Sequence, residues 1–236
     1  MEKYLHFVKN SIGRDFFVGD IHGCVDLFYT NLASKNFNPL IDRVFSVGDL
    51  VDRGLDSERA LELLEKPWFF AVRGNHEDMC ITYARWSGNV PRDLFFTKTY
   101  EANGGAWMIN LPPEDQKIYA AAFEQLPFLM TVDTDYGLVA VVHAESGNSI
   151  QSLVDALYRG DAAVVQNVLW SRERVKGEIS GQVTDVAYVL VGHTIQKKIK
   201  RMDNVLFIDT GAVFGKYGYG NLVVSTLREI LNDCTD

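Results

Sequence analysis

Residues able to bind a metal ion recur directly after short apolar segments of the sequence. Four of the five histidines occupy such positions, and only His6 lies outside the pattern. A single histidine after a strand is most often structural, but the joint pattern predicts that these residues share one site. Carboxylate and imidazole ligands without thiolates suit divalent ions such as Mn²⁺, Fe²⁺ and Zn²⁺. The residues concerned are Asp20, His22, Asp49, Asn75, His76, His143 and His193.

The segments that precede these residues have the length and the β-branched or aromatic content of buried strands. Helix-like stretches at 24–34 and 57–64 separate the first three of them. This alternation predicts βαβ units and a largely parallel sheet. Because side chains converge beyond the carboxyl ends of strands in such sheets, we expect the metal-capable residues to meet there. The five predicted strands are 15–18, 43–47, 68–72, 138–142 and 186–191, with a further pair at 205–208 and 222–225.

Composition narrows the class of protein. A chain of 236 residues that is 47% hydrophobic and 23% charged is typical of a soluble enzyme, and we expect one domain over residues 1–236. The net charge of −8 argues against a nucleic-acid partner, which normally requires a basic face. Three cysteines without CxxC spacing favour a reducing cytoplasm. No secretory leader pattern is recognisable, and no apolar run approaches the ~20 residues of a membrane helix, so no membrane partner is expected.

Three motifs together resemble the signature blocks of a known family. GDIHG (19–23), GDLVDRG (48–54) and RGNHE (73–77) match, in order and spacing, the phosphoprotein phosphatase branch of the metallophosphoesterases. The resemblance implies a calcineurin-like α/β fold, a single-domain β-sandwich flanked by helices. Four later blocks resemble the compact serine/threonine protein phosphatases of bacteriophage lambda and bacteria; they are VVHAE (141–145), WSRER (170–174), VGHT (191–194) and IDTGAVF (208–214).

This resemblance also implies two divalent metal ions. Manganese is the expected metal, with Fe²⁺ or Zn²⁺ as alternatives. Two ions about 3.5–4 Å apart lower the pKa of a bridging water and hold phosphoryl oxygens for in-line attack. The implied ligands are Asp20, His22 and Asp49 for the first ion, and Asp49, Asn75, His143 and His193 for the second, so that Asp49 bridges the pair.

Arginines beside the motifs are candidates for binding phosphate, because a guanidinium can hold two phosphate oxygens at once. Arg53 and Arg73 flank the second and third blocks directly. Arg172 is the third candidate, although Arg174 lies close enough to be confused with it. The alternative for any one of these residues is a surface salt bridge.

His76 is the candidate general acid, since an irregular loop could send Asn75 to the metal and His76 toward the leaving group. The resemblance implies that Asp52 accepts a hydrogen bond from His76, which fixes the ring and favours its protonated form. The alternative role for Asp52 is to cap a turn near Gly54. One more segment, Asn103-Gly104-Gly105, lacks the GK[ST] of a P-loop, and we expect a loop at the rim of the site.

The expected activity is that of a serine/threonine protein phosphatase. A water held between the metal ions would hydrolyse phosphoserine or phosphothreonine in proteins or peptides, with phosphotyrosine as a further expectation, and release inorganic phosphate. One alternative is a symmetrical diadenosine tetraphosphate hydrolase, which shares the metal motifs; RGNHE in place of an LGNHD-like block favours the phosphatase. One weaker alternative is a metal-binding scaffold without catalysis. Another is a nucleic-acid binder or nuclease, which the net negative charge of the chain argues against.

Overall fold

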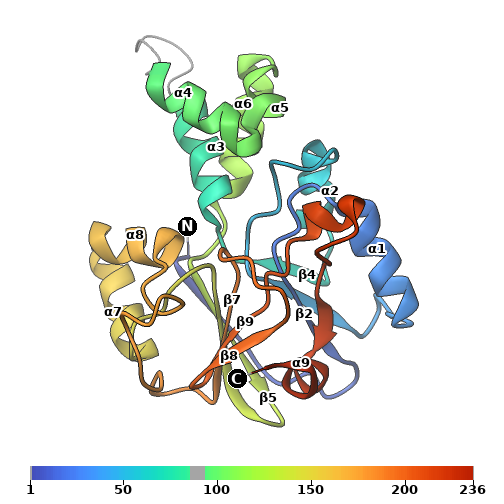
Figure 1. Ribbon diagram of the computed structural model, residues 1–236, viewed down its shortest axis with the longest axis vertical. Helices are drawn as coiled ribbons and strands as arrows, with labels where there is room; N and C mark the ends of the chain where they lie inside the picture. Colours follow the sequence, from blue (N-terminus) through green and yellow to red (C-terminus); the bar gives the residue numbers. More distant parts are fainter. Residues whose placement is uncertain (1, 86–93, 236) are drawn as a thin grey trace.

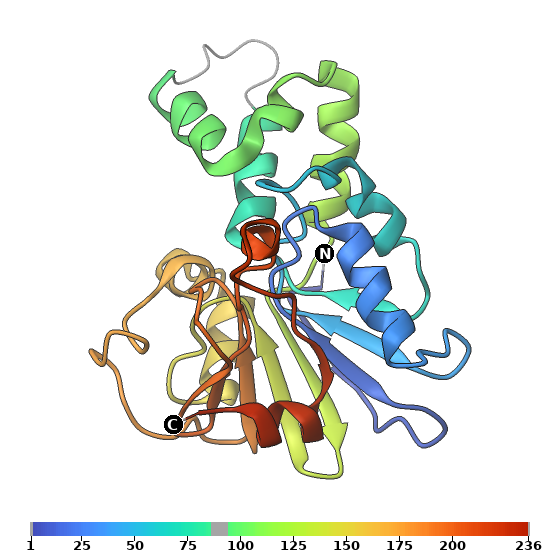
Figure 2. The same ribbon diagram turned by 45° about the vertical axis from the view of Figure 1, so that its right-hand side comes forward.

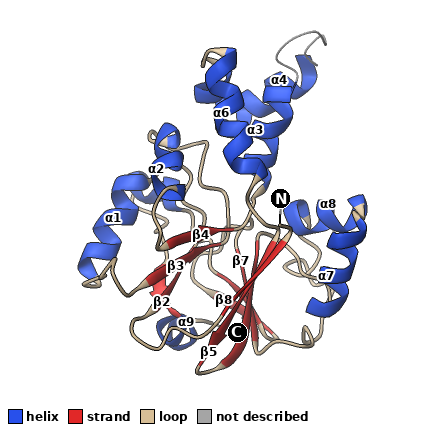
Figure 3. Ribbon diagram, turned by 180° about the vertical axis from the view of Figure 1, so that it is seen from behind, coloured by secondary structure: helices blue, strands red, loops and turns tan. Residues whose placement is uncertain are grey.

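The computed structural model describes residues 2–85 and 94–235 of the chain. Two β-sheets pack against each other at its centre, and helices cover their outer faces (Figures 1 and 3). A group of helices, from α3 (Asn75–Arg85) to α6 (Pro113–Glu124), rises above one end of the sheets (Figure 2). This architecture is the helix-flanked β-sandwich that the sequence predicts. None of the described helices combines the length and the apolar character that a membrane crossing needs.

The smaller sheet contains four strands in the order β10, β2, β3, β4. The strands β2, β3 and β4 come from the first third of the chain and run parallel to one another. The edge strand β10 is antiparallel to β2. The crossovers carry α1 (Val25–Ser34) and, after a 3₁₀ turn at Ser57–Arg59, α2 (Ala60–Leu64). These elements confirm the predicted βαβ units. The strands are β2 (Asp15–Val18), β3 (Arg43–Ser46), β4 (Phe69–Ala71) and β10 (Val224–Thr226).

The larger sheet contains six strands in the order β1, β5, β6, β7, β9, β8. Three of its five neighbouring pairs are parallel, which agrees with the predicted largely parallel arrangement, whereas two pairs, β5 with β6 and β8 with β9, are antiparallel and were not predicted. Both pairs are hairpins, and a hairpin joins neighbouring strands without a crossover helix. The strands are β1 (Tyr4–Phe7), β5 (Leu129–Thr134), β6 (Gly137–Val142), β7 (Tyr188–Val191), β8 (Lys200–Met202) and β9 (Val205–Phe207).

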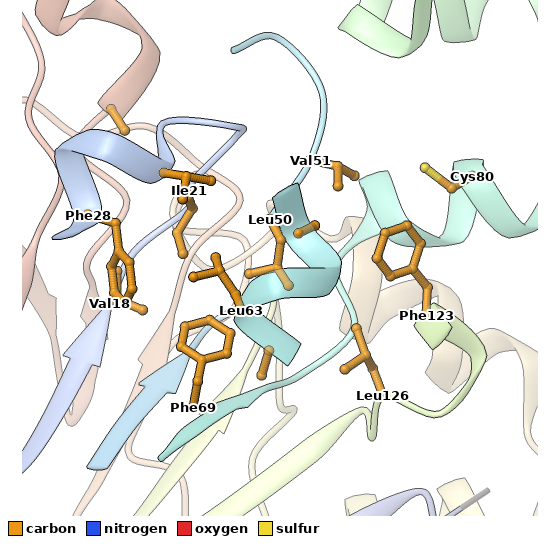
Figure 4. Close-up of a cluster of buried hydrophobic side chains, with 14 of the residues drawn as sticks. Val18, Ile21, Phe28, Leu50, Val51, Leu63, Phe69, Cys80, Phe123 and Leu126 are labelled. Atoms are coloured by element: carbon orange, nitrogen blue, oxygen red, sulfur yellow. The ribbon is translucent and has the colours of Figure 1, made fainter. Parts of the chain in front are cut away.

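Side chains alternate between two cores along the strands of the smaller sheet. In β2, Phe17 packs between the sheets, whereas Phe16 and Val18 pack under the helices. Figure 4 shows Val18 near Phe28 of α1 in this second core. Because both faces of the sheet are covered, its strands read as continuous apolar runs, which is the signal that made them predictable.

The remaining helices flank the sheets or form the raised group. α3 and α6 pack against each other, and α4, a kinked segment at Glu101–Gly105 and α5 connect them. The expectation of a loop at Asn103-Gly104-Gly105 holds only in part, because the helical segments are interrupted by a kink at Gly104, whose φ is 102°. The helices are α3 (Asn75–Arg85), α4 (Leu94–Tyr100), α5 (Ala106–Ile109), α6 (Pro113–Glu124), α7 (Ile150–Arg159), α8 (Ala162–Trp170) and α9 (Leu227–Asp233), with a 3₁₀ turn at Ala212–Tyr217.

Candidate active site

All the predicted metal ligands lie beyond the carboxyl ends of strands from both sheets. The smaller sheet contributes its residues after β2, β3 and β4, and the larger sheet contributes a histidine after β6 and another after β7. All are buried in the protein. Segments that are distant in sequence therefore meet at one edge of the sandwich, as predicted. These residues are Asp20, His22, Asp49, Asn75, His143 and His193.

Asp49 stands at the centre of two groups of side chains that could each hold a metal ion. One group consists of His22, Asp49 and His76, and the other of Asp49, His143 and His193. Asp49 Oδ2 lies 3.6 Å from His22 Nε2, and Asp49 Oδ1 lies 3.4 Å from His143 Nε2. The two carboxylate oxygens thus face opposite groups, which is the arrangement of a bridging ligand.

The first group differs in one member from the ligand set that the sequence predicts. His76 belongs to it, with Nε2 at 3.8 Å from Asp49 Oδ2. The predicted ligand Asp20 lies slightly further out, with Oδ2 at 4.0 Å from His22 Nε2, and its carboxylate accepts the backbone N–H of His193 at 3.0 Å. Asp20 therefore also ties the two halves of the site together.

The histidine rings present lone pairs toward the site. His22 and His143 each donate Nδ1–H to a backbone carbonyl, of Val51 and Val47 respectively, at 2.8 Å. Burial lowers the pKa of both rings, which keeps them neutral, so Nε2 carries the lone pair in each. His143 Nε2 faces Asn75 Oδ1 at 2.8 Å. Acceptor atoms that converge in this way fit a cation.

Buried carboxylates add negative charge beside the histidines. Burial raises the pKa of Asp20 well above its ordinary value, and the neighbouring Asp209 and Asp49 raise it further. Burial likewise raises the pKa of Asp209 to about 6. A divalent cation between two adjacent carboxyl groups would stabilise their ionised forms, so these residues also fit a metal site. Sequence reasoning missed Asp209, although it follows a predicted strand in the same way as the other ligands.

A second residue that sequence reasoning missed, Glu77, holds the backbone of the site. Its carboxylate accepts N–H groups of Asp49, Leu50 and Gly74 at 2.7–3.0 Å. Asp49 has φ of 50°, a left-handed conformation that is uncommon for residues other than glycine. A Cβ at Gly74 would lie 2.2 Å from Asp49 Oδ1, so only glycine fits there. The RGNHE block therefore supplies a support for Asp49 as well as a ligand.

His76 and Asp52 form the hydrogen bond that the resemblance implies, at 2.7 Å between Nδ1 and Oδ2. Burial alone would lower the pKa of His76, but the charges of Asp49 and Asp52 outweigh burial and raise it. The other ring nitrogen, Nε2, is buried without a hydrogen-bond partner among the described residues. His76 is thus a ring biased toward the protonated form with one N–H available to a ligand.

The three candidate arginines occupy different environments. Arg53 is exposed and donates from Nη1 to His22 Nε2 at 2.6 Å. Arg172 is also exposed and closely follows Trp170, whose ring centre lies 6.1 Å from that of His193. Burial lowers the pKa of both His143 and His193, and the charge of Arg172 adds a smaller contribution. Arg73 is buried instead, and its guanidinium lies 4.7 Å from the Phe128 ring centre. It also donates to the Glu124 carbonyl at 2.8 Å.

The structure separates Arg172 from its close neighbour Arg174. Arg174 is buried and pairs with Glu145, with Nη2 at 3.1 Å from Oε1. It also donates to the carbonyl of Gly181 at 2.9 Å. Arg174 is therefore committed to the loop that follows β6, whereas the exposed Arg172 remains the candidate for phosphate.

Comparison with known proteins agrees with this geometry. Residues 16–197 match the calcineurin-like phosphoesterase family. The chain therefore belongs to that family, in which the His and Asp groups described above could bind metal.

Curated relatives in bacteria are similar over most of the chain. It is 37% identical to serine/threonine-protein phosphatase 1 of Salmonella typhimurium over 84% of this chain and 86% of that protein. It is 32% identical to serine/threonine-protein phosphatase 2 of the same organism, over 83% and 86%. A symmetrical bis(5'-nucleosyl)-tetraphosphatase of Sodalis glossinidius is 37% identical, but only over 40% of this chain and 34% of that protein.

A solved structure shares the fold at lower sequence identity. The cold-active protein-tyrosine phosphatase of a Shewanella species superposes with a TM-score of 0.61 at 18% identity. The match covers 95% of this chain and 77% of that one. This similarity supports the sandwich architecture alone.

Proposed function

We propose that the chain is a metal-dependent serine/threonine protein phosphatase that hydrolyses phosphoserine and phosphothreonine, and also phosphotyrosine, in proteins or peptides. The observation that carries the proposal is Asp49, whose two oxygens face two separate groups of histidines. Beside it lies His76 Nε2, which has no hydrogen-bond partner in the described part of the chain. The long similarity to bacterial serine/threonine-protein phosphatases supports the same reaction. Inorganic phosphate is the second product. We further infer a cytoplasmic enzyme, in agreement with three free cysteines.

The residues that would hold two divalent ions, with Mn²⁺ as the proposed metal, are those at the strand ends. When bound, the ions would supply an activated water and positive charge for the phosphoryl oxygens. Asp20, His22 and Asp49 are the proposed ligands on one side, and His76 stays free for the proton. The ligands on the other side are Asp49, Asn75, His143 and His193.

Substrate would meet the arginines and His76. Arg53 and Arg172 are exposed at the mouth of the site, where they can hold phosphoryl oxygens and orient the ester. Arg73 is the third proposed phosphate ligand. His76 Nε2–H would protonate the departing alkoxide, while Asp52 holds Nδ1–H and stabilises the charged ring.

A symmetrical diadenosine tetraphosphate hydrolase is the second candidate. It is favoured by the similarity to the Sodalis protein, which spans only part of either chain. A phosphoanhydride releases a weakly basic nucleotide phosphate and has little need of a proton donor. The buried His76–Asp52 pair is better suited to an alkyl phosphate, whose leaving oxygen is strongly basic.

The test combines metal content with substrate choice. Purified protein is expected to contain divalent metal, to hydrolyse a phosphoserine peptide faster than diadenosine tetraphosphate, and to lose activity on chelation. Added Mn²⁺ should restore it. Faster cleavage of diadenosine tetraphosphate would replace the proposal by its rival, and full activity of chelated protein in metal-free buffer would exclude the metal-dependent reaction.

A further inference from the structure

The carboxylate that orients His76 has a second partner outside the signature motifs. Asp52 is fully buried. Its Oδ2 accepts from His76 Nδ1 at 2.7 Å, and its Oδ1 accepts from the indole Nε1–H of Trp107 at 2.6 Å. Tyr100 makes a longer contact to the same Oδ1, at 3.4 Å. Each carboxylate oxygen thus has its own short bond, one to His76 and one to Trp107.

Trp107 is itself held firmly in the raised helical group. It belongs to α5, and its ring meets that of Tyr119 in α6 edge to face, with 5.0 Å between centres. Tyr119 in turn donates its hydroxyl to the carbonyl of Glu58 at 2.8 Å. These contacts fix the indole relative to the loop that carries Asp52.

The kinked segment Glu101–Gly105 before α5 packs against the same loop. A Cβ at Gly104 would lie 2.3 Å from the backbone N of Arg53, so this segment contacts Arg53 directly. Asp52 and Arg53 have φ of 69° and 67°, an uncommon left-handed conformation. Such a conformation persists where surrounding structure holds it. The segment between α3 and α6 therefore packs against the DRG loop at the point where that loop is strained.

We propose that Trp107 is a positioning residue for proton transfer, acting through Asp52 on His76. This inference rests on the proposed function, in which His76 protonates the leaving group. The indole fixes Oδ1, which keeps Oδ2 directed at His76 Nδ1 and aims Nε2 at the substrate. Without the indole N–H, the longer contact to Tyr100 is the only side-chain hydrogen bond that Oδ1 keeps among the described residues, and the carboxylate can rotate away from His76.

The direct test is Trp107→Phe, which retains an aromatic ring against Tyr119 and removes the N–H. Loss of an orienting partner typically costs about 10–100-fold in activity. We expect a loss of this size in kcat for a phosphoserine peptide and a smaller one for para-nitrophenyl phosphate, whose leaving group needs no proton. The control is Trp68→Phe, the same substitution at a tryptophan that packs against the core between the smaller sheet and its helices. It should leave both activities unchanged.

A double-mutant cycle separates positioning from general support of the fold. In a His76→Asn background, Trp107→Phe should cause no further loss on either substrate, because the group that it positions is absent. An equal additional loss there, or equal losses on both substrates in the single variant, would overturn the proposal.

Two measurements do not depend on turnover. Metal content should stay at the wild-type level in Trp107→Phe. In nitrogen-correlated NMR spectra, the Trp107 indole N–H should resonate far downfield, and its signal should shift in the Asp52→Asn variant. An indole signal that does not change in Asp52→Asn would contradict the contact.

The failure of this inference can be distinguished from the failure of the proposed function. If His76→Asn itself shows no leaving-group bias, the proposed acid fails. If His76→Asn shows the bias and Trp107→Phe does not, only the role of Trp107 fails.

Discussion

Carboxylates at the two ends of the parallel strands β2 and β3 have opposite kinds of partner. At the amino ends, Asp15 and Arg43 face each other in register, and Arg43 donates from Nε and Nη2 to the two Asp15 oxygens at 2.8 Å. Asp42 likewise accepts from Arg14 Nη2 at 2.7 Å. Beyond the carboxyl ends, Asp20 and Asp49 instead face histidines and backbone amides.

The difference separates acids that support the fold from acids that create a site. A guanidinium pair neutralises its carboxylate within the protein, so little attraction for an external cation remains. Buried acids beside neutral histidines keep that attraction, although they cost stability until a cation arrives. The same strands therefore carry structural charge at one end and reactive charge at the other.

The largest expected effect comes from Asp49→Asn, which removes the carboxylate shared by both metal groups. The binding of both metal ions should be weakened or lost. Activity should then fall by about 10³-fold or more, because metal ions contribute several kcal/mol to stabilising the charge of the transition state. Metal per protein by mass spectrometry, measured with activity, checks this result. His193→Ala is the comparator, because it should weaken the second site alone; two occupied sites in Asp49→Asn would show that the carboxylate does not bridge.

A comparably large and more selective effect is expected from His76→Asn. Metal should be retained on the proposed ligands, while activity on a phosphoserine peptide should fall by about 10²–10⁴-fold through loss of the general acid. The loss on para-nitrophenyl phosphate should be smaller. Asp52→Asn should show the same bias in weaker form. Equal losses on both substrates with metal intact would assign His76 to phosphate binding or water positioning.

The acids at the carboxyl ends, which form no ion pair with an arginine or lysine among the described residues, also predict a dependence of stability on pH in the metal-free protein. The pKa of Asp209 is about 6, above its ordinary 3.8. Between these values the folded state holds a proton that the unfolded state has released, so the unfolding free energy should fall as pH rises through this window, by about 1 kcal/mol per pH unit at most. Asp209→Asn should flatten the slope in denaturant titrations at several pH values. A slope that persists unchanged would remove Asp209 as its source.

Much of this site could be predicted from sequence because its ligands follow a local rule. A metal-capable residue directly after a short apolar run marks a strand end, and Asp20, Asp49 and His143 all obey it. Glu77 and Trp107 escaped detection because their roles depend on contacts across the fold. Trp107 reaches Asp52 only once α5 has packed against the DRG loop, and no sequence spacing reports that approach.

The strands β1 and β5 of the larger sheet were missed for a related reason. β1 pairs with β5, which lies more than a hundred residues further along the chain, in a register that no local pattern specifies. The strand β1 (Tyr4–Phe7) is only partly buried, and it lacks the continuous apolar run that identified β2.

A smaller kinetic effect is expected from Arg73→Ala. Hydrogen bonds to a charged group contribute about 1.5–3 kcal/mol, so turnover and phosphate inhibition should each weaken by about 10–100-fold if Arg73 binds phosphate. Arg53→Ala, which alters the exposed guanidinium beside His22, is the comparator. Unchanged kinetics together with a lower melting temperature would assign Arg73 to its contacts with Glu124 and Phe128.

The smallest expected effect belongs to the paired end of the strands and has the opposite pH sign. Burial alone would raise the pKa of Asp42, but hydrogen bonds from Arg14 and from the Asn38 amide outweigh it and lower the pKa. The folded state therefore stays ionised where the unfolded state takes up a proton, so this stability is present above the ordinary pKa and is lost as pH falls below it. Asp42→Asn should reduce unfolding free energy at neutral pH by about 1 kcal/mol or less, since the Arg14 side chain is partly exposed. The difference between variant and wild type should shrink in acid. A difference that instead grows as pH falls would break the contrast between the two ends, because Asp42 would then behave as Asp209 does.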